Sequence, residues 1–218
     1  MKHQQTHPDI YQLRIVLRGI SPLIWRRLQV RSDTTLAQLH LMLQILFDWC
    51  DEHLHRFHIF GKDYGSDGAD TRTVRLSAFG FHPGERFRYV YNYWADWQCD
   101  IRLEAVLPVE PDRFYPVCPG GQRPAPPEHV HDAWTYLELL DEHRVPPFEA
   151  ILTLADMAQA MLDAPAGVSI REAVGDLDAI REAMDRLETY AQYQPSAFKR
   201  RHINAQLRGG TWTGETAS

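Results

Sequence analysis

The chain lacks the patterns of a membrane protein or a disulfide-stabilised protein. Its 218 residues include three cysteines, at wide spacings and with no C-x-x-C pair, which favours reduced thiols. The longest apolar stretch, residues 39–47, is interrupted by His40 and Gln44 and is far shorter than the roughly 20 residues of a membrane span. The N-terminal segment has no apolar run of the signal-peptide type. We therefore expect a cytoplasmic protein with no membrane partner.

Motifs for nucleophilic catalysis and nucleotide binding are also missing. The chain has no G-x-S-x-G sequence, and the paired-glycine segment GGQRPAP leads into prolines instead of a helix. The formal net charge of −6 opposes non-specific attraction to phosphate backbones, although a local basic patch can override it. These absences argue against a hydrolase or a nucleotide enzyme and disfavour nucleic acid as a partner.

Alternating apolar and polar residues predict an antiparallel sheet. Residues 11–17 alternate in this way and the alternation resumes over 24–30 after a Gly and Pro turn, which indicates a hairpin. Thr35 and Gln38 match a capping box, so a helix should run from there to about Asp48 and lie on the sheet.

The strongest alternation comes later, over 87–93 and 97–103, and predicts two paired strands whose aromatic residues pack in the core. A strand is expected at 54–60 and a short edge strand at 74–76, with an exposed loop over 61–72. Five prolines and two glycines between Phe114 and Val130 predict a structured loop across one end of the sheet.

From Trp134 onward the pattern is helical. We expect helices at 134–142 and 148–163, and a long one from Ser169 to about Tyr193 that opens with a Ser169–Glu172 capping box. The predicted fold class is therefore α+β, a mixed and mainly antiparallel sheet with one helix packed on it, followed by a C-terminal helical region. We expect one domain over 9–208, with a sheet core at 9–132, a helical part at 133–208, and flexible tails at 1–8 and 209–218.

Several linked motifs resemble a known family. They are ISPLIWRRLQV, TLAQLHLMLQILFDW, HLHRFHIFGKDYG, YNYWADWQCDI, YPVCPGGQRPAPPEH, WTYLELL and FKRRHIN. Together they cover most of residues 10–207 and resemble the plasmid pRiA4b ORF-3-like proteins. The resemblance implies an α+β fold and an origin on plasmids and beside insertion-element transposition genes, and it implies no established activity. Where relatives tend to have an aspartate-rich turn and a following histidine, this chain has Asn92, Asp96 and Cys99.

Histidines are numerous, and six lie in or beside these motifs: His40, His53, His55, His58, His129 and His131. His53 and His55 should project from one strand face, while Glu128, His129 and His131 approach from the proline-rich loop. Imidazoles with a carboxylate suit a divalent transition metal, so these five residues are the predicted metal ligands. The alternative is that the histidines bond to backbone groups or occupy half-exposed sheet positions.

A second candidate site is a ligand-binding surface. Trp25, Arg26 and Arg27 combine a stacking ring with two guanidinium groups, and Asp96, Trp97 and Glu128 complete the predicted set. The alternative is structural: Arg27 packs over the Trp25 ring while Arg26 pairs with a carboxylate. The basic run at 199–202 is interpreted as a solvated turn.

Three functions remain open. The first is a non-enzymatic binding or adaptor module carried with mobile elements, which binds an unknown protein or small ligand without a cofactor. The second is a metal-dependent enzyme in which Glu128 is the acid or base. The third is a DNA-binding accessory of transposition that uses Arg26, Arg27 and residues 199–201.

Overall fold

The computed structural model describes residues 8–142, 146–169, 171–172, 175–192 and 198–213. Contacts group the chain into two compact units. One comprises residues 1–136 and 196–218, here called the sheet unit, and the other comprises residues 137–195, here called the hairpin unit. The organisation into a single domain over 9–208 stays a prediction.

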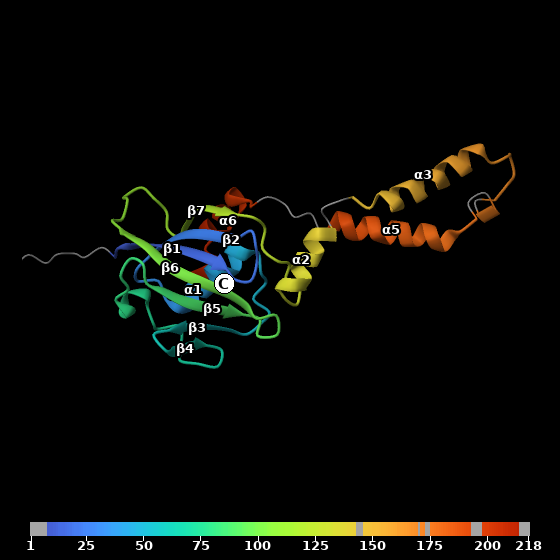
Figure 1. Cartoon of the computed structure of the whole chain (residues 1–218). Helices are drawn as coiled ribbons and strands as arrows, with labels where there is room; N and C mark the ends of the chain where they lie inside the picture. The colour runs from blue at the N-terminus through green and yellow to red at the C-terminus, as the bar shows by residue number, and fades with distance from the viewer. Residues whose placement is uncertain (1–7, 143–145, 170, 173–174, 193–197, 214–218) are drawn as a thin grey trace, which may run out of the picture. The chain divides into compact units, whose positions relative to one another are not determined.

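A seven-stranded antiparallel sheet forms the sheet unit, in the order β4-β3-β5-β6-β1-β2-β7 (Figure 1). The strands are β1 (Ile10–Leu17), β2 (Ile24–Arg31), β3 (His55–Ile59), β4 (Lys62–Gly65), β5 (Arg86–Tyr91), β6 (Trp97–Leu107) and β7 (Val117–Gln122). The sheet is open, because β4 and β7 lie at its two edges. With the helices described below, this confirms the predicted α+β class.

The helix α1 (Leu36–Phe47) covers one face of the sheet. It begins at a complete capping box, in which the Thr35 hydroxyl accepts from the Gln38 amide and the Gln38 side chain accepts from the Thr35 amide. It ends at Asp48, whose backbone is left-handed. Leu39, Leu43 and Leu46 are fully buried with the inward residues of β1 and β2. The predicted hairpin, capping box and helix are confirmed.

Three predicted connections differ in the structure. Residues 61–72 were expected to form an exposed loop but contain the edge strand β4, which pairs with β3. Residues 74–76 form no strand; Arg75 makes a single bridge with Thr35 and the short 3-10 helix η1 (Leu76–Phe79) follows. The proline-rich segment contains β7, which pairs with β2 as an edge strand, where a strand tolerates proline.

The later helices partly match the predictions. The helices α2 (Ala133–Glu142) and α3 (Phe148–Asp163) lie where expected. The expected long helix is shorter: the Ser169–Glu172 capping box forms, but the non-helical residues Gly175, with φ +74°, and Asp176 precede α5 (Leu177–Gln192). Residues 170 and 174, which the predicted long helix includes, lie outside the described residues. Within the hairpin unit, α3 and α5 pack side by side (Figure 1).

The C-terminal segment returns to the sheet unit. Residues 200–208 form the helix α6 (Arg200–Arg208) instead of the expected solvated turn, and Ile203 and Leu207 are buried. The 3-10 helix η2 (Thr211–Thr213) contacts α1, and the Trp212 indole donates to the Leu207 carbonyl at 2.7 Å. This packing explains why residues 211–213 are ordered where a flexible tail was expected.

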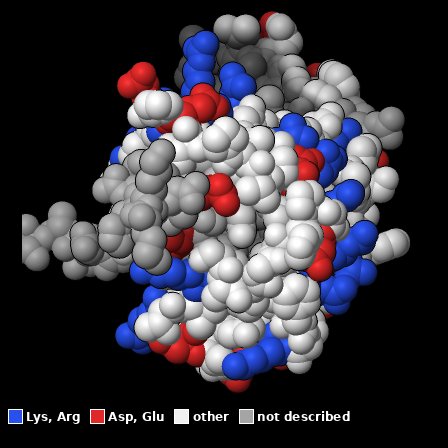
Figure 2. All heavy atoms as spheres, turned by 90° about the vertical axis from the view of Figure 1, so that its left-hand side faces the viewer, with Lys and Arg blue, Asp and Glu red and all other residues white. Residues whose placement is uncertain are grey.

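Two surface properties bear on function. None of the described helices combines the length and apolar character needed to cross a membrane. On the face that Figure 2 displays, Lys and Arg side chains are interspersed with Asp and Glu and do not gather into one stripe.

Candidate metal centre

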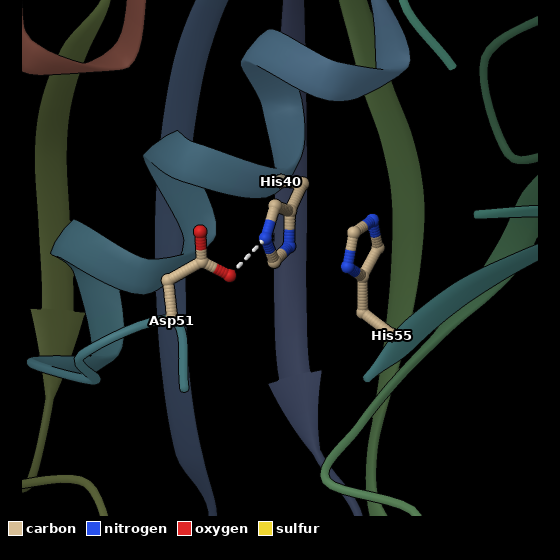
Figure 3. Close-up of side chains that lie close together, drawn as sticks. All are labelled: His40, Asp51 and His55. Carbon is tan, nitrogen blue, oxygen red and sulfur yellow. Dashed lines mark hydrogen bonds and ion pairs between the residues drawn. The ribbon is translucent and has the colours of Figure 1, made fainter. Parts of the chain in front are cut away.

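Three side chains from different segments meet beside the end of α1. His40 lies on the sheet-facing side of α1 and is 5% exposed, Asp51 lies in the turn after α1, and His55 is the first residue of β3 (Figure 3). One ring nitrogen of each histidine and one carboxylate oxygen of Asp51 lie within 4.8 Å of one another. They form the only group of three or more metal-ligand side chains found in the part of the chain that the structure describes.

A closed ring of hydrogen bonds sets the tautomer of His40. The Asp51 amide donates to Gln44 Oε1 at 3.2 Å, so Gln44 Nε2 points to the Tyr89 hydroxyl and donates to it at 2.9 Å. The Asp51 carboxylate can only accept, so Nε2 carries the proton of the neutral His40 ring and donates it to Asp51 Oδ1 at 2.6 Å. His40 Nδ1 therefore accepts from the Tyr89 hydroxyl, 2.8 Å away.

His55 stacks on His40 without sharing its hydrogen bonds. The two rings are nearly parallel, 8° apart, with centroids separated by 3.5 Å. Burial first, and the neighbouring His40 second, lower the pKa of His55 to about 3, and burial also lowers the pKa of His40. Both rings are therefore neutral at pH 7. His55 Nε2 is buried and has no hydrogen-bond partner among the described residues.

The backbone amides of residues 50–52 donate three hydrogen bonds that hold the turn carrying Asp51. Glu128 accepts from the Cys50 amide at 2.6 Å, Gln44 accepts from the Asp51 amide, and the Tyr91 hydroxyl accepts from the Glu52 amide at 3.1 Å. Tyr91 donates its own proton to Glu128. Burial raises the pKa of Glu128, but the hydrogen bonds from Tyr91 and Cys50 outweigh burial and leave it lowered. Glu128 is thus an ionised residue that positions the turn.

The other predicted metal ligands lie outside this cluster. His53 precedes β3, so it does not share a strand face with His55; it is exposed and meets the Tyr91 ring edge-on. His129 and His131 are exposed in the loop after β7. Of the five predicted ligands, the structure brings only His55 to the cluster.

The predicted ligand-binding residues are spread over separate parts of the sheet unit. Trp25 lies on the sheet face opposite Arg26, with the Arg14 guanidinium 4.6 Å and the Arg27 guanidinium 5.7 Å from its ring centroid. Arg27 packs over the Trp25 ring as expected. Its guanidinium also pairs with Glu104 at 2.5 Å.

Arg26 does not pair with a carboxylate, which corrects the structural interpretation. It is 2% exposed, and it donates to the carbonyls of Leu46, Trp25 and Gln122 at 2.8 to 2.9 Å. Burial lowers its pKa to about 10, so it stays charged at pH 7.

The remaining two residues lie at the turn between β5 and β6. Asp96 is exposed, has φ +49°, and accepts from Gln98 Nε2 at 2.6 Å. Trp97 is buried at 2% exposure in the core. Neither residue contacts Trp25 or Glu128 through any interaction found among the described residues.

Sequence reasoning missed His40 and Asp51 as site residues. The sequence contains one indication of His40, which is a titratable residue on the apolar stripe of α1 beside Leu36, Leu39 and Leu43. It contains no indication of Asp51, since the position of Asp51 depends on the direction of the chain after α1.

The open antiparallel sheet with one helix on its inner face defines an α+β protein. The model of the plasmid pRiA4b ORF-3-like family matches residues 9–162, which include every residue of the candidate centre. The chain belongs to this family, which confirms the resemblance.

Two relatives are themselves uncharacterised. The uncharacterized protein y4hQ of Sinorhizobium fredii is 28% identical over 149 residues, 65% of this chain and 76% of that protein. The crystal structure of MM3350, a protein of unknown function from Methanosarcina mazei, superposes with a TM-score of 0.59 at 34% identity, over 62% of this chain and 82% of that chain. The relatives support the fold and name no ligand.

Proposed function

We propose that the protein binds a divalent transition metal, with zinc as the first candidate, through His40, Asp51 and His55. The observation that carries this proposal is the convergence of two imidazole nitrogens and a carboxylate oxygen within 4.8 Å. Two imidazoles and a carboxylate form a donor set that zinc and other first-row metals use in proteins.

The surroundings of the ligands support the proposal. His55 Nε2 is a buried nitrogen that lacks a partner, and burial keeps both rings neutral and so able to donate lone pairs. For a metal to bind at His40 Nε2, the ring proton has to move from Nε2 to Nδ1 and the Tyr89 hydroxyl proton has to turn away, so that Nδ1 donates to the Tyr89 oxygen, 2.8 Å away. A ligating histidine is commonly fixed by such a second hydrogen bond.

The parallel rings set a condition on binding. Ring-nitrogen lone pairs lie in the ring planes, so stacked rings direct them side by side and not at one point. Coordination of one ion by both histidines therefore requires the rings to tilt. Asp51 is exposed and gives an ion access from solvent. Three protein ligands leave a position for water or a substrate, as in catalytic zinc sites, where the metal acidifies bound water.

The other hypotheses have weaker support. A binding surface formed by Trp25, Asp96 and Glu128 needs these side chains together, but Trp25 lies on the sheet face away from α1 while Glu128 lies beside the end of α1. A binding or adaptor role, and an association with mobile elements, stay predictions.

Elemental analysis of untagged protein purified without chelators tests the proposal. We expect close to one equivalent of transition metal, and cobalt-loaded protein should show visible ligand-field absorption. His55→Ala and Asp51→Asn should weaken zinc binding by roughly 100-fold or more, since outer-shell changes alone cost 10–100-fold.

His58→Ala is the matched control. His58 lies on the same strand as His55 and pairs with Asp63 at 2.7 Å, but no second histidine joins that exposed pair. This variant should bind zinc like the unmodified protein. Absence of metal together with absence of cobalt absorption contradicts the proposal, and so does an equal loss in His58→Ala and His55→Ala.

A further inference from the structure

A cavity of about 440 Å³ lies between β7 and α6 in the sheet unit. Four of the residues that line it are arginines: Arg113, Arg200, Arg201 and Arg208. Among the described residues, no acidic side chain lines it. The cavity is therefore cationic, although the whole chain carries a formal charge of −6.

Three of the four guanidinium groups have no carboxylate partner among the described residues. Arg113 pairs with Glu110 at 2.8 Å, which offsets its charge. Arg200 donates one N–H to the Pro119 carbonyl at 3.1 Å, which fixes the side chain without neutralising it. The side chains of Arg201 and Arg208 have no hydrogen bond or ion pair in the part of the chain that the structure describes.

The wall that carries these arginines is held firmly. Asn204, in the middle of α6, accepts from the Cys118 amide at 2.8 Å and donates to the Cys118 carbonyl at 2.9 Å, so it fastens the helix to the edge strand. Ile203 and Leu207, on the neighbouring face of α6, are buried. A Cβ at Gly121 would lie 2.7 Å from the Phe198 ring, so glycine is needed for this close approach.

Helical spacing directs the cationic groups to one place. Arg201, Asn204 and Arg208 are three and four residues apart, which puts them on the same face of α6. Guanidinium groups match phosphate oxygens through paired hydrogen bonds. Burial raises the pKa of the Cys118 thiol to about 11, so it stays protonated and the cavity has no reactive thiolate.

We propose that this cavity binds a pyrophosphate group, either as free pyrophosphate or as part of a nucleotide. Two or more linked phosphates can engage several guanidinium groups at once, which a single phosphate cannot do to the same extent. A nucleic-acid duplex fits less well, because it requires an extended basic surface, whereas this cationic site is a local concavity.

Calorimetric titration at low salt, with a chelator present, tests the proposal independently of the metal centre. Pyrophosphate, adenosine triphosphate and inorganic phosphate are titrated in turn. We expect saturable one-to-one binding of pyrophosphate, at least tenfold tighter than inorganic phosphate. Similar affinity for the triphosphate identifies the pyrophosphate group as the feature recognised, and tighter binding of the triphosphate assigns the nucleotide as the ligand.

Single variants locate the binding. Arg201→Gln and Arg208→Gln should each weaken pyrophosphate binding at least tenfold. Arg201→Lys should retain part of the affinity, since lysine keeps the positive charge but cannot donate the paired hydrogen bonds of a guanidinium group. Arg72→Gln removes the same charge from an exposed loop residue paired only weakly with Asp70 and should change affinity less than twofold.

Three results overturn the proposal: no saturable binding of pyrophosphate or triphosphate, an equal loss in Arg72→Gln and Arg201→Gln, or binding that is confined to duplex DNA. The last result, measured by fluorescence anisotropy, assigns the arginines to nucleic acid.

Discussion

The two candidate sites both lie in the sheet unit and differ in the charge that their side chains carry. At the end of α1, burial keeps the imidazoles of His40 and His55 neutral and leaves a single carboxylate beside them. At the edge strand β7, the arginines of α6 line an open cavity and keep their charge. The first site therefore suits a cation and the second an anion.

The difference follows from the elements that carry the residues. His40 projects from the helix face that packs on the sheet, so its environment is dry and its polar neighbours are few and specific. Arg201 and Arg208 project from a face of α6 that is not buried, so they stay in contact with solvent. The site of low charge therefore lies on the buried face of α1, and the site of high charge lies on the exposed face of α6.

Arg26 connects the two regions, and its removal should have the largest effect on stability. It donates to Leu46 at the end of α1 and to Gln122 at the end of β7. Arg26→Met leaves buried carbonyls without donors, at about 1–3 kcal/mol for each such group. We expect the free energy of unfolding to fall by about 3 kcal/mol, measured by urea denaturation.

Arg27→Met is the control for this effect. Arg27 is the neighbouring residue, but its partner Glu104 lies on the open face of the sheet, where an ion pair is worth about 1 kcal/mol or less. A loss of the same size in both variants would mean that Arg26 does not join the regions in the way its hydrogen bonds indicate.

Local sequence patterns predicted most of the strands of the sheet unit but not its edge strands β4 and β7. Alternation predicted β1, β2, β5 and β6 because each has one buried face, and the Thr35 capping box predicted the start of α1. The edge strand β7 was missed because its prolines oppose a central strand while an edge position tolerates them. The break before α5 depends on one residue, Gly175. A single glycine does not interrupt the apolar periodicity of a helix, so the sequence pattern did not reveal the break.

The candidate metal centre could be predicted only in part, because tertiary structure assembles it. His55 was included on the basis of histidine density and strand position. Asp51 joins it only because α1 ends at Asp48 in a left-handed conformation and Gln44, Tyr91 and Glu128 then hold the turn. No local pattern encodes a turn held from three distant parts of the chain.

Tyr89→Phe sharpens the comparison at the candidate metal centre, with a smaller effect than loss of a ligand. It removes the hydroxyl that orients His40 and leaves the three ligands in place. We expect zinc affinity to fall 10–100-fold, measured by competition with a chromogenic chelator. Tyr11→Phe is the control, because Tyr11 is a buried tyrosine on β1 whose hydroxyl has no hydrogen bond to the three ligands or to the Asp51 turn among the described residues. Equal affinities in the two variants would contradict the orienting role.

The smallest expected effect concerns the open face of the sheet, where charge is neither buried nor gathered. The hydrogen bond from Arg27 lowers the pKa of Glu104 below its usual 4.5. The folded state therefore favours the ionised carboxylate, so this stabilisation is present above about pH 5 and is lost as the pH falls through the folded-state pKa. Since Glu104 is only partly buried, we expect less than about 1 kcal/mol. Urea denaturation at pH 7 and pH 3 should show a smaller pH effect in Glu104→Gln than in the unmodified protein. An unchanged pH effect would show that the pair with Arg27 contributes nothing to stability.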